Sequence, residues 1–116
     1  MEELNLLHIA PIRFAREILC KEETKARVSL VYEQFPSLGM MIEGAAQASA
    51  SFGDDSTQGG FLVSLKNVKL LEKPESIFLE IELLKEHDLG SMTYFNFVIF
   101  EETKELVKGS FVIAKS

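Results

Sequence analysis

Glu43 is the residue whose position most strongly indicates chemistry, because it is the one charged side chain between Gln34 and Gly53. Desolvation disfavours the ionised form of a carboxyl group. An acid in so apolar a stretch is therefore a candidate general acid or base near neutral pH. Burial of a bare carboxylate also costs free energy and needs a reason. The alternative is that Glu43 completes a hydrogen-bond network at a subunit interface.

Three further positions near Glu43 could assist it. Gln47 lies one helical turn later on the same face, where it either orients the carboxylate or forms a hydrogen bond between two helices of a dimer. Gly39 and Met40 stand near the start of the predicted helix. Free backbone N–H groups and the positive end of the helix dipole favour a developing negative charge there. Gly39 and Met40 are thus candidates for holding a reacting carbonyl oxygen.

The helix that would carry these residues is predicted within 34–53. Small and apolar side chains recur there at the i, i+3, i+4, i+7 spacing of a helix, at Leu38, Met41, Ile42, Ala45, Ser49 and Phe52. Ser37 is a candidate N-cap, and Gly53 is a candidate stop signal. The opposite face is small or apolar as well, so the helix should be buried on most sides.

The segments around this helix have the two-residue alternation of β-strands. Before it, 12–20 and 25–33 predict a hairpin, and 1–11 predicts a short helix or turn ending at Pro11. After it, a strand begins near Phe61, with a register shift near Lys66 and Asn67 that is typical of a β-bulge. Further strands are expected at 77–83, 91–100 and 107–113, joined by turns at 86–90 and 101–104 in an antiparallel meander.

One helix cannot cover both faces of so long a sheet. We therefore expect an α+β fold in which an antiparallel sheet curls around one central helix. The length of 116 residues fits a single domain, 1–116. The other face of the sheet and one edge would be covered by a partner chain, which predicts a homodimer or a larger oligomer.

Composition excludes several classes of function. With 18 acidic residues against 12 Lys and Arg, the net charge of −6 argues against nucleic-acid binding. No apolar run approaches the ~20 residues of a membrane-spanning helix. The opening Met-Glu-Glu does not resemble a secretory signal, so a cytoplasmic location is expected. One cysteine and two histidines without ligand spacing predict no metal and no cofactor, and Cys20 is expected to be a buried apolar side chain.

The segment 41–48 (MIEGAAQA) resembles the helix of hotdog-fold 3-hydroxyacyl-acyl carrier protein dehydratases, in which an acid is followed four positions later by the Gln of an Ala-Gln pair. The segment 6–11 (LLHIAP) resembles an N-terminal string of that family. Segments 60–63 (GFLV) and 89–92 (LGSM) are similar to the aryl-polyene-type branch. The resemblance covers nearly the whole chain. It implies a hotdog fold with an acyl-thioester site at a dimer interface.

The chain departs from this family before the helix. The family carries a catalytic histidine in a His-Phe-Pro-Gly string, and this sequence reads QFPS at 34–37. The usual spacing counted back from Glu43 instead reaches Ser29. The resemblance therefore implies that the acid is kept and the base is lost. It also implies that Gln34 could hold water or a thioester oxygen, and that a strand amide near Ser64 is a second carbonyl-binding donor.

Three functions follow from this resemblance. The first is a 3-hydroxyacyl-thioester dehydratase-like enzyme of fatty-acid or polyene-type lipid biosynthesis, in which Glu43 protonates the leaving 3-hydroxyl group. The second is an acyl thioesterase in which Glu43 activates a water molecule. The third is a non-catalytic acyl-binding or assembly subunit. The acyl group would be carried by acyl carrier protein or coenzyme A, whose negative charges Lys66, Lys69 and Lys73 could meet unless they only form a solvated strand face.

Overall fold

The computed structural model describes residues 2–3, 14–52 and 60–115. In chain order its elements are β1 (Glu2–Glu3), β2 (Ala15–Lys21), β3 (Lys25–Val31), α1 (Leu38–Ala48), the short 3-10 helix η1 (Ser49–Phe52), β4 (Gly60–Leu70), β5 (Phe78–Asp88), β6 (Met92–Glu101) and β7 (Lys104–Lys115).

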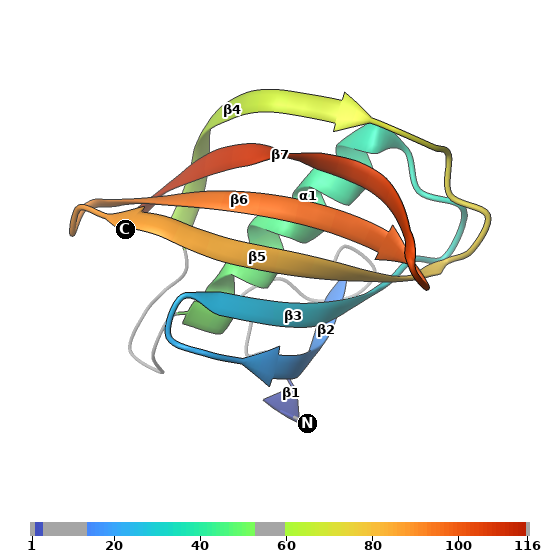
Figure 1. Cartoon of the computed structure of the whole chain (residues 1–116), viewed down its shortest axis with the longest axis horizontal. Coiled ribbons are helices and arrows are strands. Elements are labelled where there is room, and N and C mark those ends of the chain that lie inside the picture. Colours follow the sequence, from blue (N-terminus) through green and yellow to red (C-terminus); the bar gives the residue numbers. More distant parts are fainter. Residues whose placement is uncertain (1, 4–13, 53–59, 116) are drawn as a thin grey trace.

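The strands form one antiparallel sheet that curls around α1, as expected (Figure 1). Its order is β1-β2-β3-β5-β6-β7-β4, so the predicted meander is right for β5, β6 and β7 but wrong for β4. The first strand after the helix pairs with β7, and β5 pairs with β3. The reason is that α1 crosses the concave face of the sheet and carries the chain to its far edge. Alternation along a strand does not reveal that crossing.

The core lies between α1 and the concave face of the sheet. Alternate residues of the central strands point inward, such as Val28 and Leu30 on β3 and Phe97 and Ile99 on β6, and all four are buried. They pack in one cluster with the buried face of α1, which consists of Met41, Ala45 and Ala48. The apolar spacing read from the sequence therefore identifies the face of the helix that builds the core.

The start of α1 agrees with the sequence. The Ser37 side chain accepts a hydrogen bond from the Met40 N–H at 3.2 Å, so the predicted N-cap is confirmed. The helix ends at Ala48 and tightens into η1, whose Phe52 ring packs 5.5 Å from that of Phe95. The predicted stop at Gly53 lies outside the described residues.

Other local predictions need correction. Glu2 and Glu3 pair with β2 as a strand, so the helix predicted at 1–11 is wrong there, and 4–13 lies outside the described residues. The turn predicted at 86–90 starts later, because β5 continues to Asp88 across a register shift between Lys85 and His87. Cys20 is exposed near the end of β2 instead of buried.

The β-bulge predicted in β4 is confirmed. Lys66 pairs with Ser110 and Lys69 pairs with Lys108, so β4 contains one extra residue between these pairs. Asn67, within this bulge, has a φ of 55°. No helix in the part of the chain that the structure describes is long and apolar enough to cross a membrane.

Candidate active site on the helix

Gln47 fixes α1 to the start of β2. Its side-chain oxygen accepts the N–H groups of Phe14 at 2.7 Å and Ala15 at 3.1 Å. These two donors determine which end of the amide is the oxygen, so the nitrogen must face the other way. There it donates to Glu43 Oε1 at 3.5 Å. Gln47 therefore orients Glu43 and also binds the protein backbone, while being only 4% exposed.

Glu43 itself is exposed in the single chain, so the prediction that its carboxylate is buried is wrong for the monomer. Burial alternates around α1: Gly44 and Ala45 face the sheet, whereas Gly39 and Glu43 face outward. The uncharged sequence around Glu43 does not enclose it, because Glu43 lies on the face of α1 that points away from the sheet. A second chain over this face would be needed to bury it.

Tyr32, directly after β3, anchors the same part of the helix. Its ring is 2% exposed and stacks on Phe14 with centroids 4.7 Å apart. Its hydroxyl donates to the Met40 carbonyl at 3.2 Å. Gly44 permits this approach, since a Cβ there would lie 2.5 Å from the Tyr32 hydroxyl oxygen. Burial raises the pKa of the Tyr32 phenol well above its usual range, and the negative charge of Glu43 raises this pKa further.

The first turn of α1 offers fewer free donors than the sequence predicts. The Met40 N–H is already bonded to the Ser37 cap, so Met40 is wrong as a free carbonyl-binding donor in this structure. Gly39 is exposed in the same turn, where an α-helix leaves N–H groups without partners inside the helix. Gly39 thus stays a prediction as the carbonyl-binding amide, four residues before Glu43.

The remaining candidates are not joined to Glu43. Gln34 is exposed in the segment between β3 and α1, beside the 64% exposed ring of Phe35. Ser64 lies on β4 opposite Val112, next to a second register shift. Five candidates besides Glu43 were predicted. Among the hydrogen bonds of the described residues, Gln47 is the one of these five that bonds to Glu43. Their joint role would need a rearrangement or a second chain.

Sequence reasoning missed Tyr32, although its contact with Gly44 shapes the site. A glycine in a helix next to the acid indicates a close approach by another group, but the sequence does not say which group. As to metals, no cluster of three or more His, Cys, Asp or Glu side chains suited to a metal ion occurs within the described ranges.

Similarity to known proteins is confined to three-dimensional structure. No protein-family model matches the sequence, and no curated protein matches it significantly. A chain of the dehydratase heterocomplex ApeI:P from Xenorhabdus doucetiae superposes with a TM-score of 0.80 at 15% identity, covering 96% of this chain and 88% of that one.

Two structures from streptococci are also similar. A hypothetical thioesterase with coenzyme A from Streptococcus pneumoniae TIGR4 has a TM-score of 0.66 at 18% identity, covering 86% of this chain and 84% of that one. The protein smu.793 from Streptococcus mutans UA159, bound to acetyl-CoA, has a TM-score of 0.71 at 14% identity, covering 96% of this chain and 95% of that one. At these identities the similarity concerns the fold alone, and the chain has the hotdog fold.

Proposed function

We propose that this chain is an acyl-thioester-processing protein, a 3-hydroxyacyl-thioester dehydratase-like enzyme in which Glu43 is the catalytic residue. The observation that carries the proposal is the Gln47 amide, which holds the Glu43 carboxylate on the open face of α1. An oriented carboxylate in the middle of α1, one turn after the exposed Gly39, can exchange a proton with a bound thioester. The dehydratase chain and the coenzyme A complexes among the similar structures support this class of substrate.

The absence of a histidine at position 34 restricts the mechanism. The Gln34 amide cannot accept the C2 proton of a 3-hydroxyacyl group. The Glu43 carboxylate would therefore act first as the base that removes this proton. It would then pass the proton to the leaving 3-hydroxyl group, which departs as water while the C2–C3 double bond forms. A single carboxylate that acts first as the base and then as the acid thus balances the reaction.

The proposed site is completed in a homodimer formed along β4. This strand is at the edge of the sheet, with one side unpaired within the described residues. Leu62, Leu65 and Leu70 each lie opposite a buried residue of β7, so they face the concave side. They are nevertheless 37%, 42% and 44% exposed, because α1 does not cover them. A second copy would cover these leucines and shield Glu43.

The partner molecules would be acyl carrier protein or coenzyme A carrying the acyl group, in the cytoplasm as the sequence predicts. A second candidate function is acyl thioesterase, favoured by the similar hypothetical thioesterase with coenzyme A from Streptococcus pneumoniae. There the Glu43 carboxylate would activate a water molecule that attacks the thioester carbonyl. A non-catalytic acyl-binding or assembly subunit is the third, and the dehydratase heterocomplex ApeI:P supports it.

The test is an assay with crotonyl-coenzyme A that follows enoyl absorbance and free thiol in the same sample. Loss of enoyl absorbance without thiol is expected for hydration, the reverse of dehydration. Thiol release would instead assign a thioesterase. Glu43→Gln should abolish either activity, whereas Glu105→Gln, at an exposed glutamate on β7, should leave it unchanged. If neither signal changes, also with longer and carrier-linked acyl groups, the enzyme proposal is wrong and the acyl-binding subunit replaces it.

A further inference from the structure

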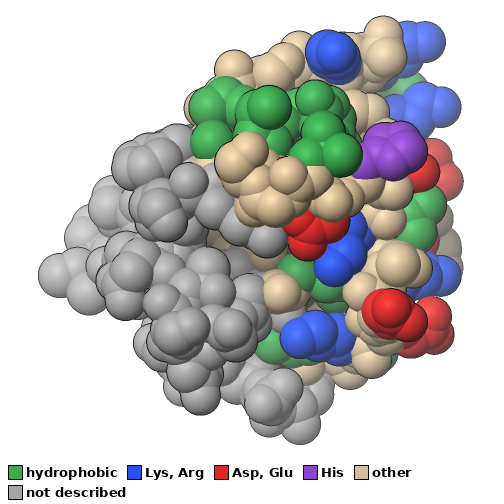
Figure 2. Space-filling model, turned by 90° about the vertical axis from the view of Figure 1, so that its left-hand side faces the viewer, with side chains coloured by type: hydrophobic (Ala, Val, Ile, Leu, Met, Phe, Trp, Pro, Cys, Tyr) green, Lys and Arg blue, Asp and Glu red, His purple; other side chains and the backbone are tan. Residues whose placement is uncertain are grey.

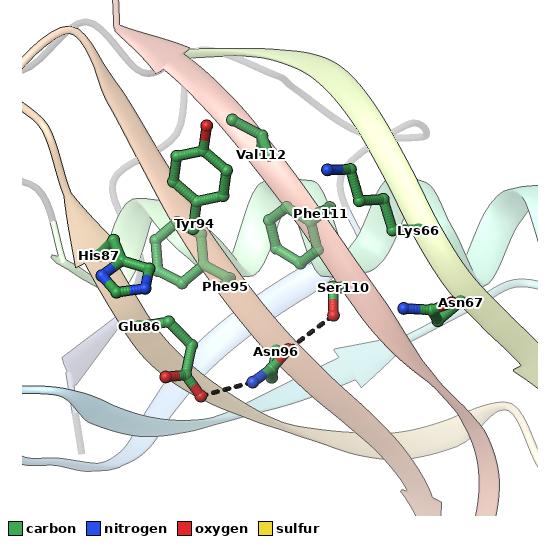
Figure 3. Close-up of a pocket in the computed structure, with 10 residues that line it drawn as sticks. All are labelled: Lys66, Asn67, Glu86, His87, Tyr94, Phe95, Asn96, Ser110, Phe111 and Val112. Carbon is green, nitrogen blue, oxygen red and sulfur yellow. Dashed lines mark hydrogen bonds between the residues drawn. The ribbon is translucent and has the colours of Figure 1, made fainter.

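A pocket lies on the convex face of the sheet, away from α1. Figure 3 shows its polar side chains in front of the sheet, with the helix behind. Tyr94 and Asn96 reach this face because they alternate along β6 with Phe95 and Phe97, which are buried against the helix side. The pocket has a volume of about 270 Å³, just below the range of small-molecule sites, which begins at about 300 Å³. The sheet separates it from Glu43.

Two strand irregularities build the walls of this pocket. The register shift between Lys85 and His87 in β5 places Glu86 and His87 side by side at the pocket. The bulge in β4 places Lys66 and the left-handed Asn67 on the other side. Bulges of this kind redirect side chains and are common next to functional sites. Figure 3 shows the two walls facing each other across β6 and β7.

The two walls differ in charge. Lys66 is exposed, and the next outward pair along these strands is Lys69 opposite Lys108. Two lysines directly opposite each other repel. No ion pair of these three lysines occurs within the part of the chain that the structure describes. The chain has a net charge of −6, so these three lysines form a local basic patch that would attract an anion.

The opposite wall contains hydrogen-bond acceptors and aromatic rings. Glu86 accepts a hydrogen bond from Asn96, and Asn96 in turn accepts one from the Ser110 hydroxyl, so the floor of the pocket is ordered (Figure 3). His87 packs edge-on against Tyr94 with ring centroids 6.1 Å apart. Seen from the end of the molecule, a histidine borders a group of hydrophobic side chains, with charged side chains on its other side (Figure 2). This wall therefore suits a neutral group that donates hydrogen bonds.

We propose that this pocket binds a small phosphate ester whose other end carries hydroxyl or amino groups, as in a nucleoside monophosphate. The phosphate would lie at Lys66, with Lys69 and Lys108 adding to the attraction. The sugar or base would lie against Tyr94 and donate to Glu86. Three strand spacings separate the two walls, about 14 Å, which a nucleoside monophosphate can span. The site is independent of the thioester site proposed above.

The probe is AMP, titrated into the 116-residue chain and followed by backbone amide NMR, with adenosine and inorganic phosphate as comparisons. AMP should shift the amides of Tyr94, Asn96 and Ser110, and adenosine should bind at least about tenfold more weakly. Lys66→Gln should weaken AMP binding about tenfold. The matched control Lys21→Gln, at an exposed lysine that ends β2, should not change it.

Two further variants separate the possible outcomes. Glu86→Gln removes a negative charge, so it should strengthen the binding of inorganic phosphate relative to AMP. Glu43→Gln should leave AMP binding intact, which distinguishes failure of this proposal from failure of the thioester proposal. The proposal is overturned if AMP shifts no pocket amide at millimolar concentration. It is equally overturned if adenosine binds as well as AMP, or if Lys66→Gln binds AMP like the unmodified chain.

Discussion

The Gln47 amide nitrogen lies 3.5 Å from Glu43 Oε1 while its oxygen binds the backbone of β2. One side chain therefore joins the candidate catalytic acid to the sheet. This geometry makes Gln47 both a structural and a positioning residue. Its two roles can be separated, because the contacts to β2 determine stability and the contact to Glu43 determines the orientation of the acid.

Gln47→Ala should lower the free energy of unfolding by about 1–3 kcal/mol, because two backbone N–H groups lose their shared acceptor in a nearly closed site. Chemical denaturation measures this change. Gln34→Ala is the matched control, since Gln34 is exposed, and it should change stability by less than about 0.5 kcal/mol. Equal effects of the two substitutions would contradict the anchoring role of Gln47.

Gly44→Ala should destabilise the fold, although alanine normally stabilises a helix over glycine by about 1 kcal/mol. The added Cβ would lie 2.5 Å from the Tyr32 hydroxyl, and overpacking of this kind costs about 1–3 kcal/mol. The double variant Gly44→Ala/Tyr32→Phe should recover part of the loss, because it removes the clashing oxygen.

Gly39→Ala is the control for that experiment. Its Cβ would meet only the Ser37 side chain, at an ordinary contact distance of 3.9 Å. Thermal unfolding should show the melting temperature unchanged or raised for Gly39→Ala and lowered for Gly44→Ala. The reverse order would exclude the close contact between Tyr32 and the helix.

Stability should fall at alkaline pH through Tyr32. Burial, followed by the charge of Glu43, raises the pKa of its phenol in the folded state. The unfolded chain ionises this group near pH 10, whereas the folded chain does not. The stabilisation is therefore complete below about pH 10 and is lost above it at about 1.4 kcal/mol per pH unit. Tyr32→Phe should lose less stability over the same range, and tyrosinate absorbance during unfolding checks the assignment.

The proposed dimer gives a prediction at the edge of the sheet. Leu65→Glu would place a charge in the interface formed by β4, and should weaken dimerisation roughly a hundredfold. Light scattering over a dilution series measures this change. Leu89→Glu is the control, because Leu89 is 63% exposed in the turn between β5 and β6. A monomeric unmodified chain, or equal behaviour of both variants, would rule out this interface.

The main elements of the fold can be predicted from the sequence, because the signals that mark them are local. Ser37 was identifiable as the helix cap since the cap is three residues from its partner Met40. The bulge near Asn67 was visible since an extra residue interrupts a two-residue alternation. The face of α1 that contains Met41 and Ala45 could be predicted as core for the same reason.

The contacts between distant segments are visible only in the folded chain. The pairing of β4 with β7, the exposure of Glu43 and the approach of Tyr32 to Gly44 depend on contacts between segments that are not adjacent in the sequence. Gln47 illustrates both cases. Its four-residue spacing from Glu43 predicts that the two side chains share one face of the helix. Its hydrogen bonds to Phe14 and Ala15, in contrast, span more than 30 residues of sequence. No periodicity encodes such contacts, because they arise when the helix packs against the sheet.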